Sequence, residues 1–394
     1  MELNTVLSIL GRRLRLAVIG GGPGSFIGAM HRQAARLDDR YELVTGILSS
    51  DAERSKRAGL ELGLPPDRLY SSVQELMDAE SARKDGVDVV AIMTPNDSHY
   101  EYSMSALEHG FDVICDKPMT NTLDEAEALH KKVQDSGLVF CLTHNYTGYP
   151  MVKQAREMVA TGKLGKIRKV VVEYPQGWLA TRLEATGQKQ AGWRTDPKQS
   201  GAAGCIGDVG THAENLAEYI SGLEIDELAA DLTTFVKGRA LDDDGNVLLR
   251  FKGGAKGVLH ASQISVGEEN NLNIRVYGEI GGIEWHQKEP NTMLVKWLDQ
   301  PMQVYRTGLG YLGNAAKSAT RVPPAHPEGY LEAFANIYKN FANAIRARVE
   351  NRKLAKDDPA NDYPKVGDAV RGMAFIEAVV KSSAKNAKWT KLKV

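Results

Sequence analysis

Apolar residues follow two alternating patterns along the first third of the chain. Short apolar runs predict strands at 14–19, 41–48, 87–93, 112–115 and 139–143. Between these runs, apolar residues recur with a helical period at 28–36, 52–62, 98–109 and 122–136. Strands that alternate with helices predict a doubly wound parallel sheet, because each helix returns the chain to the next parallel strand.

The pattern changes after Pro150. A helical segment at 152–160 is followed by predicted strands at 166–174, 228–236, 246–251, 255–265 and 271–277. The Gly-Gly pairs that begin at Gly253 and Gly281 predict hairpin turns. Strands that follow one another without helices predict an open, mainly antiparallel sheet. Two more helices are predicted at 328–346 and 367–384.

These patterns predict an α/β protein with two domains, because 394 residues exceed what one hydrophobic core accommodates comfortably. Residues 1–146 are expected to form a Rossmann domain that binds a dinucleotide. Residues 147–394 are expected to form an α+β domain that binds the substrate and mediates oligomerisation. The C-terminal helices are free to pack back on the first domain.

The composition narrows the class of partner. Lys and Arg number 49 against 50 for Asp and Glu, so the net charge of -1 lacks the basic surplus typical of proteins that bind nucleic acid or anionic membranes. No apolar stretch predicts a signal peptide or a membrane helix, and three cysteines without metal-type spacing favour a reducing cytoplasm. A small molecule is therefore the expected partner.

A glycine-rich turn follows the first predicted strand directly. It reads Gly20-Gly21-Gly22-Pro23-Gly24-Ser25 and precedes a predicted helix. Glycines permit a tight turn and close approach of the backbone, and a helix N-terminus offers free N–H groups to a pyrophosphate. Gly20 and Gly22 match the first two glycines of G-x-G-x-x-G, whereas Ser25 holds the third place and Gly28 comes three residues later. We predict that Gly20, Gly22, Gly24 and Ser25 bind the cofactor.

The end of the second predicted strand bears on the choice between NAD and NADP. NAD enzymes often place an acid there for the ribose hydroxyls, but this chain has Ser49, Ser50 and then Asp51. Arg54, one helical turn later, has the charge to attract a 2′-phosphate. Asp51 either contacts the ribose or caps the following helix. NAD is the expected cofactor, with NADP as the alternative. Ser49, Ser50 and Arg54 are predicted to bind the adenosine end of either cofactor.

Together with the glycine turn, three further stretches resemble the glucose–fructose oxidoreductase / inositol dehydrogenase family (Gfo/Idh/MocA). They are Thr94-Pro95-Asn96-Asp97-Ser98-His99, Cys115-Asp116-Lys117-Pro118 and Asp208-Val209-Gly210-Thr211-His212. Their order and separations are similar to those of the family along nearly the whole chain. The resemblance therefore implies an NAD(P)-dependent oxidoreductase with a Rossmann domain.

The resemblance also assigns roles. It implies that Lys117 is the catalytic lysine, with Asp116 in place of the usual glutamate, and that the bond from Lys117 to Pro118 is cis. It places Asp208 and His212 in the family's signature of an acid and a histidine one helical turn apart. Tyr146 is implied at the domain junction, on the substrate side. The residues implied at the cofactor are Thr94, Pro95, Asn96, His99, Asp116, Lys117 and Asn145.

The chemistry of these residues agrees with alcohol oxidation. Removing hydride from a carbinol needs a base for the hydroxyl proton and a donor for the oxygen that becomes a carbonyl. His212 suits the first task, Lys117 the second, and Asp208 is expected to bind a neighbouring hydroxyl. Each has an ordinary alternative: Lys117 as a surface lysine, His212 as a histidine satisfied within a helix, and Asp208 as a helix N-cap.

The segment before Asp208 is expected to be an extended loop that covers the substrate. It contains Trp178, Trp193 and Arg194, and indole faces with a guanidinium suit the C–H faces and hydroxyls of a sugar. Either tryptophan has the alternative of a structural role in the core. No basic cluster suggests a phosphate, so we expect an unphosphorylated sugar, anhydrosugar or inositol.

Oxidation of one secondary hydroxyl to a ketone is the predicted reaction. Two alternatives remain: redox-neutral cleavage of a glycoside through a transient keto-sugar, and a cofactor-sensing protein without catalysis. No metal site is predicted, although the spacing of Asp208 and His212 permits two ligands. A homodimer or homotetramer is expected, because one face of an open antiparallel sheet needs cover and members of the family commonly pair through it.

Overall fold

The computed structural model describes residues 4–394, which divide into two compact units. The first unit contains the described residues up to Thr120, then Asp124–Gly148 and Tyr330–Ala369. The second contains Asn121–Leu123, Tyr149–Gly329 and Val370–Val394. Residues 1–3 of the predicted first domain lie outside the described residues. The assignment of nucleotide binding to 1–146 and substrate binding to 147–394 stays a prediction.

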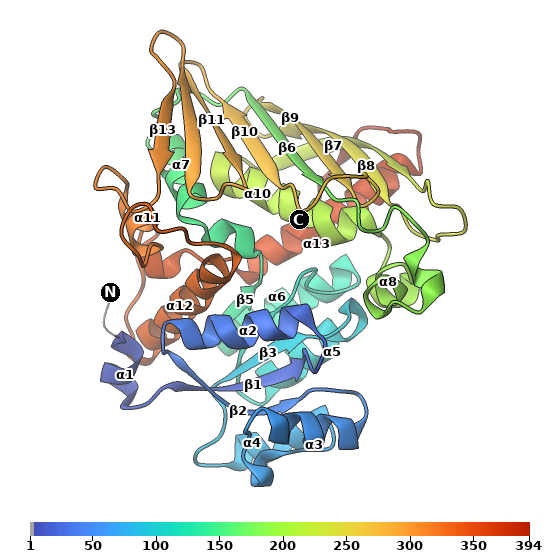
Figure 1. The fold of residues 1–394 in the computed structure, drawn as a ribbon, viewed down its shortest axis with the longest axis vertical. Coiled ribbons are helices and arrows are strands. Elements are labelled where there is room, and N and C mark those ends of the chain that lie inside the picture. Colours follow the sequence, from blue (N-terminus) through green and yellow to red (C-terminus); the bar gives the residue numbers. More distant parts are fainter. Residues whose placement is uncertain (1–3) are drawn as a thin grey trace. The chain divides into compact units, whose positions relative to one another are not determined.

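The first unit is built on a five-stranded parallel sheet with the order β2-β1-β3-β4-β5 (Figure 1). Its strands are β1 (Leu14–Gly20), β2 (Tyr41–Ile47), β3 (Val89–Met93), β4 (Asp112–Cys115) and β5 (Phe140–Leu142). The order reverses beside β1, which is where open α/β sheets bind their ligands. The predicted doubly wound sheet is therefore confirmed.

Helices connect these strands and cover the sheet. They are α1 (Thr5–Leu10), α2 (Phe26–Leu37), α3 (Ala52–Glu61), α4 (Val73–Ala82), α5 (His99–Glu108), α6 (Leu123–Ser136) and α12 (Tyr330–Val349). Side-chain caps begin several of them: Ser25 Oγ accepts from the Gly28 amide in α2, and Asp51 Oδ1 accepts from the Arg54 amide in α3. The turns Pro66–Arg68, Asn96–Ser98, Asn145–Gly148 and Pro359–Asn361 are 3₁₀-helical.

Helix α12 belongs to the first unit although it is nearly two hundred residues downstream of the last strand of that sheet. It lies beside α2 (Figure 1) and buries Phe334, Tyr338 and Phe341 against the same core as the strands. Its Arg348 makes a bidentate ion pair with Asp112 of β4 at 2.6 and 2.7 Å. Apolar packing and this ion pair together therefore attach α12 to the five-stranded sheet.

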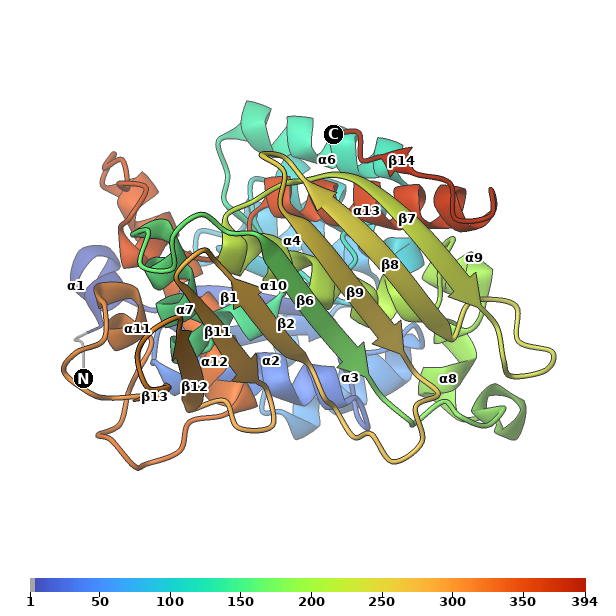
Figure 2. The same ribbon diagram turned by 90° about the horizontal axis from the view of Figure 1, so that it is seen from above.

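The second unit holds a nine-stranded sheet with the order β13-β12-β11-β10-β6-β9-β8-β7-β14 (Figure 2). Only β6 and β9 pair in parallel among its described strands, so the sheet is mainly antiparallel, as predicted. The strands are β6 (Lys169–Pro175), β7 (Ile225–Thr233), β8 (Asp244–Phe251), β9 (Lys256–Ser262), β10 (Asn273–Tyr277), β11 (Gly281–His286), β12 (Thr292–Trp297), β13 (Gln303–Arg306) and β14 (Thr390–Lys391).

Helices pack on one face of this sheet. They are α7 (Pro150–Ala160) and α10 (Thr211–Ser221), with α13 (Val366–Ser383) beside β7. Figure 2 shows the opposite face of the sheet in front of these helices. On β8 the buried residues Val247 and Leu249 alternate with the exposed Asn246 and Leu248, as expected for a sheet with one covered face. The smaller helices are α8 (Lys189–Arg194), α9 (Pro197–Ser200) and α11 (Asn314–Ser318).

Three sequence-based expectations about local structure are wrong. The segment expected as an extended loop contains α8, α9 and the 3₁₀ turn Leu183–Thr186, whose short length gave no clear helical period. The pair at Gly281 begins β11 and does not form the turn, which lies at 278–280. The strand predicted at 228–236 begins three residues earlier, at Ile225. Between residues 4 and 394, no helix has the length and apolar character needed to cross a bilayer.

Candidate active site

The glycine turn connects β1 to α2 and requires bare backbone at two positions. A Cβ on Gly22 would lie 2.0 Å from the Leu48 carbonyl oxygen at the end of β2. Gly20 has φ +86°, and a Cβ there would lie 2.7 Å from the Met93 carbonyl oxygen. The turn therefore runs in contact with the ends of β2 and β3, where the sheet edge opens to a ligand.

Gly28 performs the packing role that the third glycine of the motif usually has. A Cβ at this position would lie 2.0 Å from the Gly21 carbonyl oxygen, so the first turn of α2 packs directly against the glycine turn. Ser25 caps the helix and occupies the place of that third glycine. The motif spacing is irregular because the glycine that packs against the turn is Gly28, inside α2, and not the residue at position 25.

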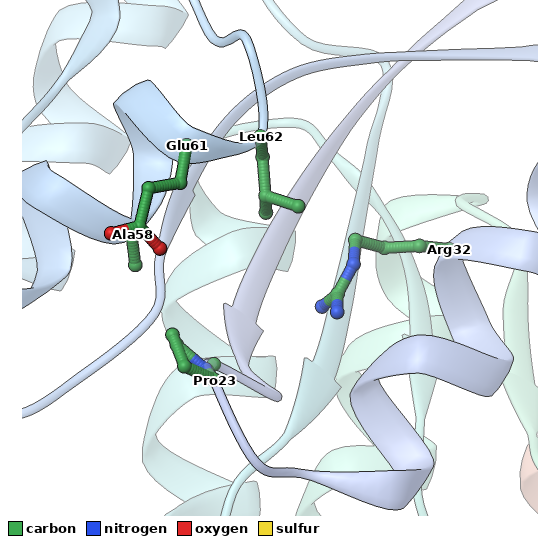
Figure 3. A pocket seen from close by; sticks show the side chains of 6 residues that line it. Pro23, Arg32, Ala58, Glu61 and Leu62 are labelled. Carbon is green, nitrogen blue, oxygen red and sulfur yellow. The ribbon is translucent and has the colours of Figure 1, made fainter.

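A cavity of about 280 Å³ borders the glycine turn (Figure 3). Arg32 of α2 reaches toward it and donates to the Gly21 carbonyl oxygen at 2.6 Å. On its other side lie residues from the second half of α3. The lining consists of Gly22, Pro23, Arg32, Ala58, Glu61 and Leu62. The hollow combines apolar surface with one guanidinium and one carboxylate.

The end of β2 carries a polar pair at the position that discriminates between cofactors. Arg54 Nε donates to Ser49 Oγ at 2.8 Å, and both groups reach solvent. Asp51 caps α3, so the capping alternative is confirmed for that residue. Ser50 is exposed. At this strand end the half-buried Ser49 hydroxyl is therefore paired with a guanidinium, and the Asp51 carboxylate is used by the helix cap.

The loop after β3 is tied to the Lys117 segment through His99. The His99 ring is buried, with Nδ1 2.8 Å from the Pro118 carbonyl oxygen and Nε2 2.9 Å from the Thr94 carbonyl oxygen. The Lys117–Pro118 peptide bond is cis, as expected. His99 is therefore positioned to hold the two predicted cofactor loops, with Pro95 and the buried Asn96 between them.

Lys117 itself is half-buried and lies near the fully buried His144. Burial and the positive charge of Lys117 lower the pKa of His144 to about 3. His144 is thus neutral above that pH. The half-buried Lys117 side chain lies close enough to this imidazole for its charge to act on it.

The depressed pKa of His144 predicts a pH dependence of stability. In the unfolded chain a histidine titrates near its ordinary value of about 6.5, so the unfolded state gains a proton that the folded state refuses as the pH falls. We expect this residue alone to cost about 2 kcal/mol of stability between pH 7.5 and pH 5. Urea unfolding at the two pH values, compared with His144→Gln, measures the difference. Equal pH dependence in both proteins would contradict it.

Asn145 and Tyr146 lie in the 3₁₀ turn Asn145–Gly148 and are both buried. Gly148 packs against α12, where its carbonyl oxygen accepts from Asn336 Nδ2 at 2.9 Å. The Tyr146 ring meets the Tyr330 ring at a centroid distance of 6.1 Å. Within residues 4–394, nothing accepts a hydrogen bond from Asn145 Nδ2, although this amide is buried. A water or ligand oxygen beside this amide would supply the acceptor that the protein does not.

The second unit concentrates polar side chains on Asp208. This residue lies in a π-helical turn, Ile206–Gly210, that continues into α10. Its Oδ2 accepts from Arg194 Nε at 3.1 Å and from Gln263 Nε2 at 2.8 Å. Because α10 begins without a side-chain cap, the alternative of Asp208 as an N-cap is wrong. Single π-helical turns occur frequently at functional sites.

Aromatic rings surround this carboxylate cluster. The Arg194 guanidinium lies 4.2 Å from the Trp193 ring centroid and 6.0 Å from that of Trp178. His212, one turn along α10, has its ring 6.1 Å from the Tyr174 ring. Both tryptophans are half-buried, so each retains an exposed surface. Indole faces, a guanidinium, a carboxylate and an imidazole thus gather in one unit.

Sequence reasoning identified Asp208, His212, Arg194 and the tryptophans but missed Gln263. Gln263 directly follows β9, and no motif marks it, although a polar residue at the end of a buried strand was an available signal. Lys117 and the cofactor residues belong to the first unit, and Asp208 with its neighbours to the second.

The described residues also test two other kinds of site. No three His, Cys, Asp or Glu side chains converge on a common metal position anywhere in residues 4–394. Cys115, Cys141 and Cys205 are all reduced and buried, and burial raises the pKa of each thiol. They are therefore inert core residues and not nucleophiles.

Two family models match the chain. One, described as "Oxidoreductase family, NAD-binding Rossmann fold", matches residues 14–144. The other, described as "GFO/IDH/MocA C-terminal domain", matches residues 152–284. The first match covers the glycine turn and the Lys117 segment, and the second covers Asp208 and His212.

Similar proteins match over nearly the whole chain. The uncharacterized oxidoreductase YfiI of Bacillus subtilis (strain 168) is 34% identical, with 98% of each chain covered. Levoglucosan dehydrogenase of Pseudarthrobacter phenanthrenivorans is 26% identical, with 95% of this chain and 97% of the relative covered. An inositol dehydrogenase homologue from Azotobacter vinelandii, solved with NADH and myo-inositol, is 35% identical with a TM-score of 0.89, covering 96% of this chain and 98% of that one.

Proposed function

This chain belongs to the Gfo/Idh/MocA family of oxidoreductases and has an NAD-binding Rossmann domain, and from this premise we propose that it oxidises one secondary hydroxyl of a sugar, anhydrosugar or inositol to a ketone. The similar proteins support this substrate class, because one is named levoglucosan dehydrogenase and another was solved with myo-inositol. NAD, with NADP as the alternative, is the proposed cofactor.

The cluster around Asp208 is the observation that carries the substrate proposal. Its carboxylate is held by Arg194 and Gln263, and indole rings flank the guanidinium. A polyhydroxylated ring presents hydroxyls to such donors and acceptors and C–H faces to such indoles. We propose that Trp178, Trp193, Arg194, Asp208 and His212 bind the substrate in the second unit, and Tyr146 and Lys117 in the first.

Two observations in the first unit support the binding of a dinucleotide. The contact of Gly22 with the Leu48 carbonyl oxygen leaves no room for a side chain, as close approach of a pyrophosphate requires. The buried Asn145 amide lacks an acceptor, which a ligand oxygen would supply. We propose that Gly20, Gly22, Gly24 and Ser25 hold the pyrophosphate, while Thr94, Pro95, Asn96 and Asn145 contact the nicotinamide end, supported by His99 and Asp116.

The proposed reaction divides proton and hydride between protein and cofactor. The nicotinamide, when bound, supplies the acceptor for the hydride. His212 accepts the proton of the substrate hydroxyl as general base, and the Lys117 ammonium donates a hydrogen bond to the same oxygen as its bond to carbon becomes double. Asp208 binds a neighbouring hydroxyl and so fixes which carbon is oxidised.

Absorbance of the reduced cofactor tests this function directly. The purified protein is given NAD or NADP with a panel of inositols, aldoses and anhydrosugars. A substrate-dependent rise that is lost in Lys117→Ala and in His212→Ala supports the proposal. Glycoside cleavage without net reduced cofactor would overturn it in favour of the redox-neutral reaction, and cofactor binding without any turnover in favour of a sensing role.

Cofactor choice has its own test at the end of β2. Because Ser49 and Arg54 form the polar pair there, we expect the protein to bind NADPH as well as NADH. Arg54→Ala should weaken NADPH binding by about tenfold or more and NADH binding by less than about threefold, since an arginine contact to phosphate is charge-assisted. Fluorescence titration measures both. Arg57→Ala, on the same exposed helix, is the control; equal weakening for both cofactors would contradict the prediction.

We also propose that the protein is a homodimer or homotetramer. The uncovered face of the large sheet carries exposed apolar side chains, including Leu248 and Val304 at 52% and 50% exposure. Size-exclusion chromatography with light scattering measures the state, and a monomer would contradict it. Three buried reduced cysteines suit the cytoplasm, which we propose as its location.

A further inference from the structure

A buried chain of hydrogen bonds leads from α12 to the residue before Lys117. The Tyr338 hydroxyl lies 2.6 Å from His31 Nδ1, and His31 Nε2 lies 2.9 Å from Asp116 Oδ1. Thr143 Oγ1 donates to the same carboxylate oxygen at 2.5 Å. His31 is fully buried in α2, and Tyr338 is 1% exposed. Three elements far apart in the sequence therefore converge on one carboxylate.

The hydrogen-bonding capacity of the carboxylate fixes one proton of this chain. A carboxylate only accepts, so His31 Nε2 carries a hydrogen and donates it to Asp116. Nδ1 lies within hydrogen-bond distance of the Tyr338 hydroxyl, a group that both donates and accepts. Both ring nitrogens of His31 therefore have a partner inside the protein.

The apolar surroundings of His31 strengthen these hydrogen bonds. The Phe334 ring lies edge-on to the His31 ring at a centroid distance of 4.8 Å, which excludes water from the imidazole. In such an apolar setting a hydrogen bond to a charged group is worth more than in water. Burial opposes the ionisation of Asp116, but the proximity of His31 and the hydrogen bonds from His31 and Thr143 outweigh it, so the pKa of Asp116 lies below its ordinary value.

The backbone carries this arrangement to Lys117. The Asp116 amide donates to the Ile92 carbonyl oxygen at 2.9 Å, so the residue is held from its main chain and its side chain at once. On the following side, His99 holds the Pro118 carbonyl oxygen. Lys117 is thus the single residue between two fixed neighbours.

We propose that His31, with Tyr338 behind it, is a positioning residue for Lys117, because it holds the Asp116 carboxylate ionised and in one orientation. The inference rests on the proposed function for the role of Lys117 in turnover. The charged and titratable groups that face Asp116 are His31 of α2, His99 of α5 and the adjacent Lys117, with Cys115 before it and Tyr338 of α12 beyond His31. A change at His31 acts on Lys117 through this carboxylate.

Four variants separate positioning from mere packing. His31→Leu removes the donor at similar size, His31→Gln retains an amide near the place of Nε2, and Tyr338→Phe removes only the outer hydroxyl. His109→Leu is the matched control, because His109 also pairs with an aspartate, Asp78 at 3.1 Å, in the same unit. Thermal unfolding and NADH fluorescence show which variants are folded and bind the cofactor.

In turnover, His31→Leu should lower kcat by about 10- to 100-fold with little change in KM, as expected for a misplaced catalytic group. Its acid limb in the pH profile of kcat/KM should move to higher pH, because Asp116 loses a hydrogen-bond donor. His31→Gln should restore kcat to within about threefold of the wild type, and Tyr338→Phe should lie between. Equal loss in His31→Leu and His31→Gln, or no loss in folded His31→Leu, would overturn the proposal.

A second readout does not depend on turnover. Pulse acetylation of the full chain, followed by peptide mass spectrometry, measures the reactivity of Lys117 relative to the other lysines. We expect His31→Leu to raise the relative rate at Lys117 by about threefold or more, because a lysine whose neighbouring residue is no longer held in one orientation is more accessible to the reagent. His31→Gln and His109→Leu should leave it unchanged. If the wild type oxidises no polyol, the proposed function fails, whereas an unchanged Lys117 rate in His31→Leu overturns the positioning role.

Discussion

Replacing Lys117 by methionine is expected to lower kcat by about 10³-fold or more, because the oxygen of the reacting hydroxyl loses its charged donor as the carbonyl forms. Methionine keeps the length of the side chain, so the packing of this half-buried position is largely retained. NADH binding, measured by fluorescence, should change by less than about threefold, since the pyrophosphate is held by the glycine turn. A loss confined to kcat identifies a group that acts on the transition state.

Lys131→Met is the matched control for this experiment. Lys131 lies on α6 of the same unit, with 75% of its side chain exposed, and pairs only with Asp135 one turn away. Such surface pairs contribute little, so the control should behave as the wild type. A Lys117→Met enzyme that retains more than a tenth of the wild-type kcat would remove Lys117 from the proposed mechanism.

Gly22→Ala is expected to weaken NADH binding by about 100-fold or more, because a cofactor turn displaced by about 1 Å loses its aligned N–H groups. The added methyl would lie 2.0 Å from the Leu48 carbonyl oxygen at the end of β2, and this contact is relieved only if the turn or the strand end moves. Calorimetric or fluorescence titration with NADH measures the loss, and circular dichroism reports whether the fold survives.

Gly110→Ala is the control outside the turn. Gly110 follows α5 in the same unit and has φ +85°, yet a Cβ there meets nothing within 4 Å. The substitution therefore adds only the cost of a left-handed conformation, about 1 kcal/mol, and should leave NADH binding within about twofold of the wild type. Equal losses of binding in Gly22→Ala and Gly110→Ala would show that the close approach to Leu48 is not what forms the binding turn.

The two units offer different kinds of groups to their proposed ligands. In the proposed function, the first unit holds the pyrophosphate through its backbone, at glycines and a helix N-terminus, where no particular side chain is needed. The second unit is proposed to bind the substrate through side chains, at Asp208, Arg194 and Gln263, which would distinguish the pattern of its hydroxyls. Substrate variation within the family is therefore expected to follow α8 and the end of β9.

Local sequence determined much of this protein. The alternation of strands and helices, the glycine turn between β1 and α2 and the cap at Asp51, one of the two roles expected for it, depend on interactions within a few residues and are confirmed. The cap at Ser25 is equally local but was not predicted. The short helix α8 was missed, because six residues span too few turns for a helical period to emerge.

Tertiary structure alone decided which distant residues meet. Tyr338 and His31 are 307 residues apart, and His31 and Asp116 are 85 apart, so no spacing in the sequence indicates their contact. Gln263 reaches Asp208 across 55 residues for the same reason. The packing of α12 on the five-stranded sheet likewise depends on complementary side chains from separate segments and on the ion pair between Arg348 and Asp112. Local chemistry thus provided the candidates for the reactive groups, whereas their orientation depends on contacts that only the folded chain creates.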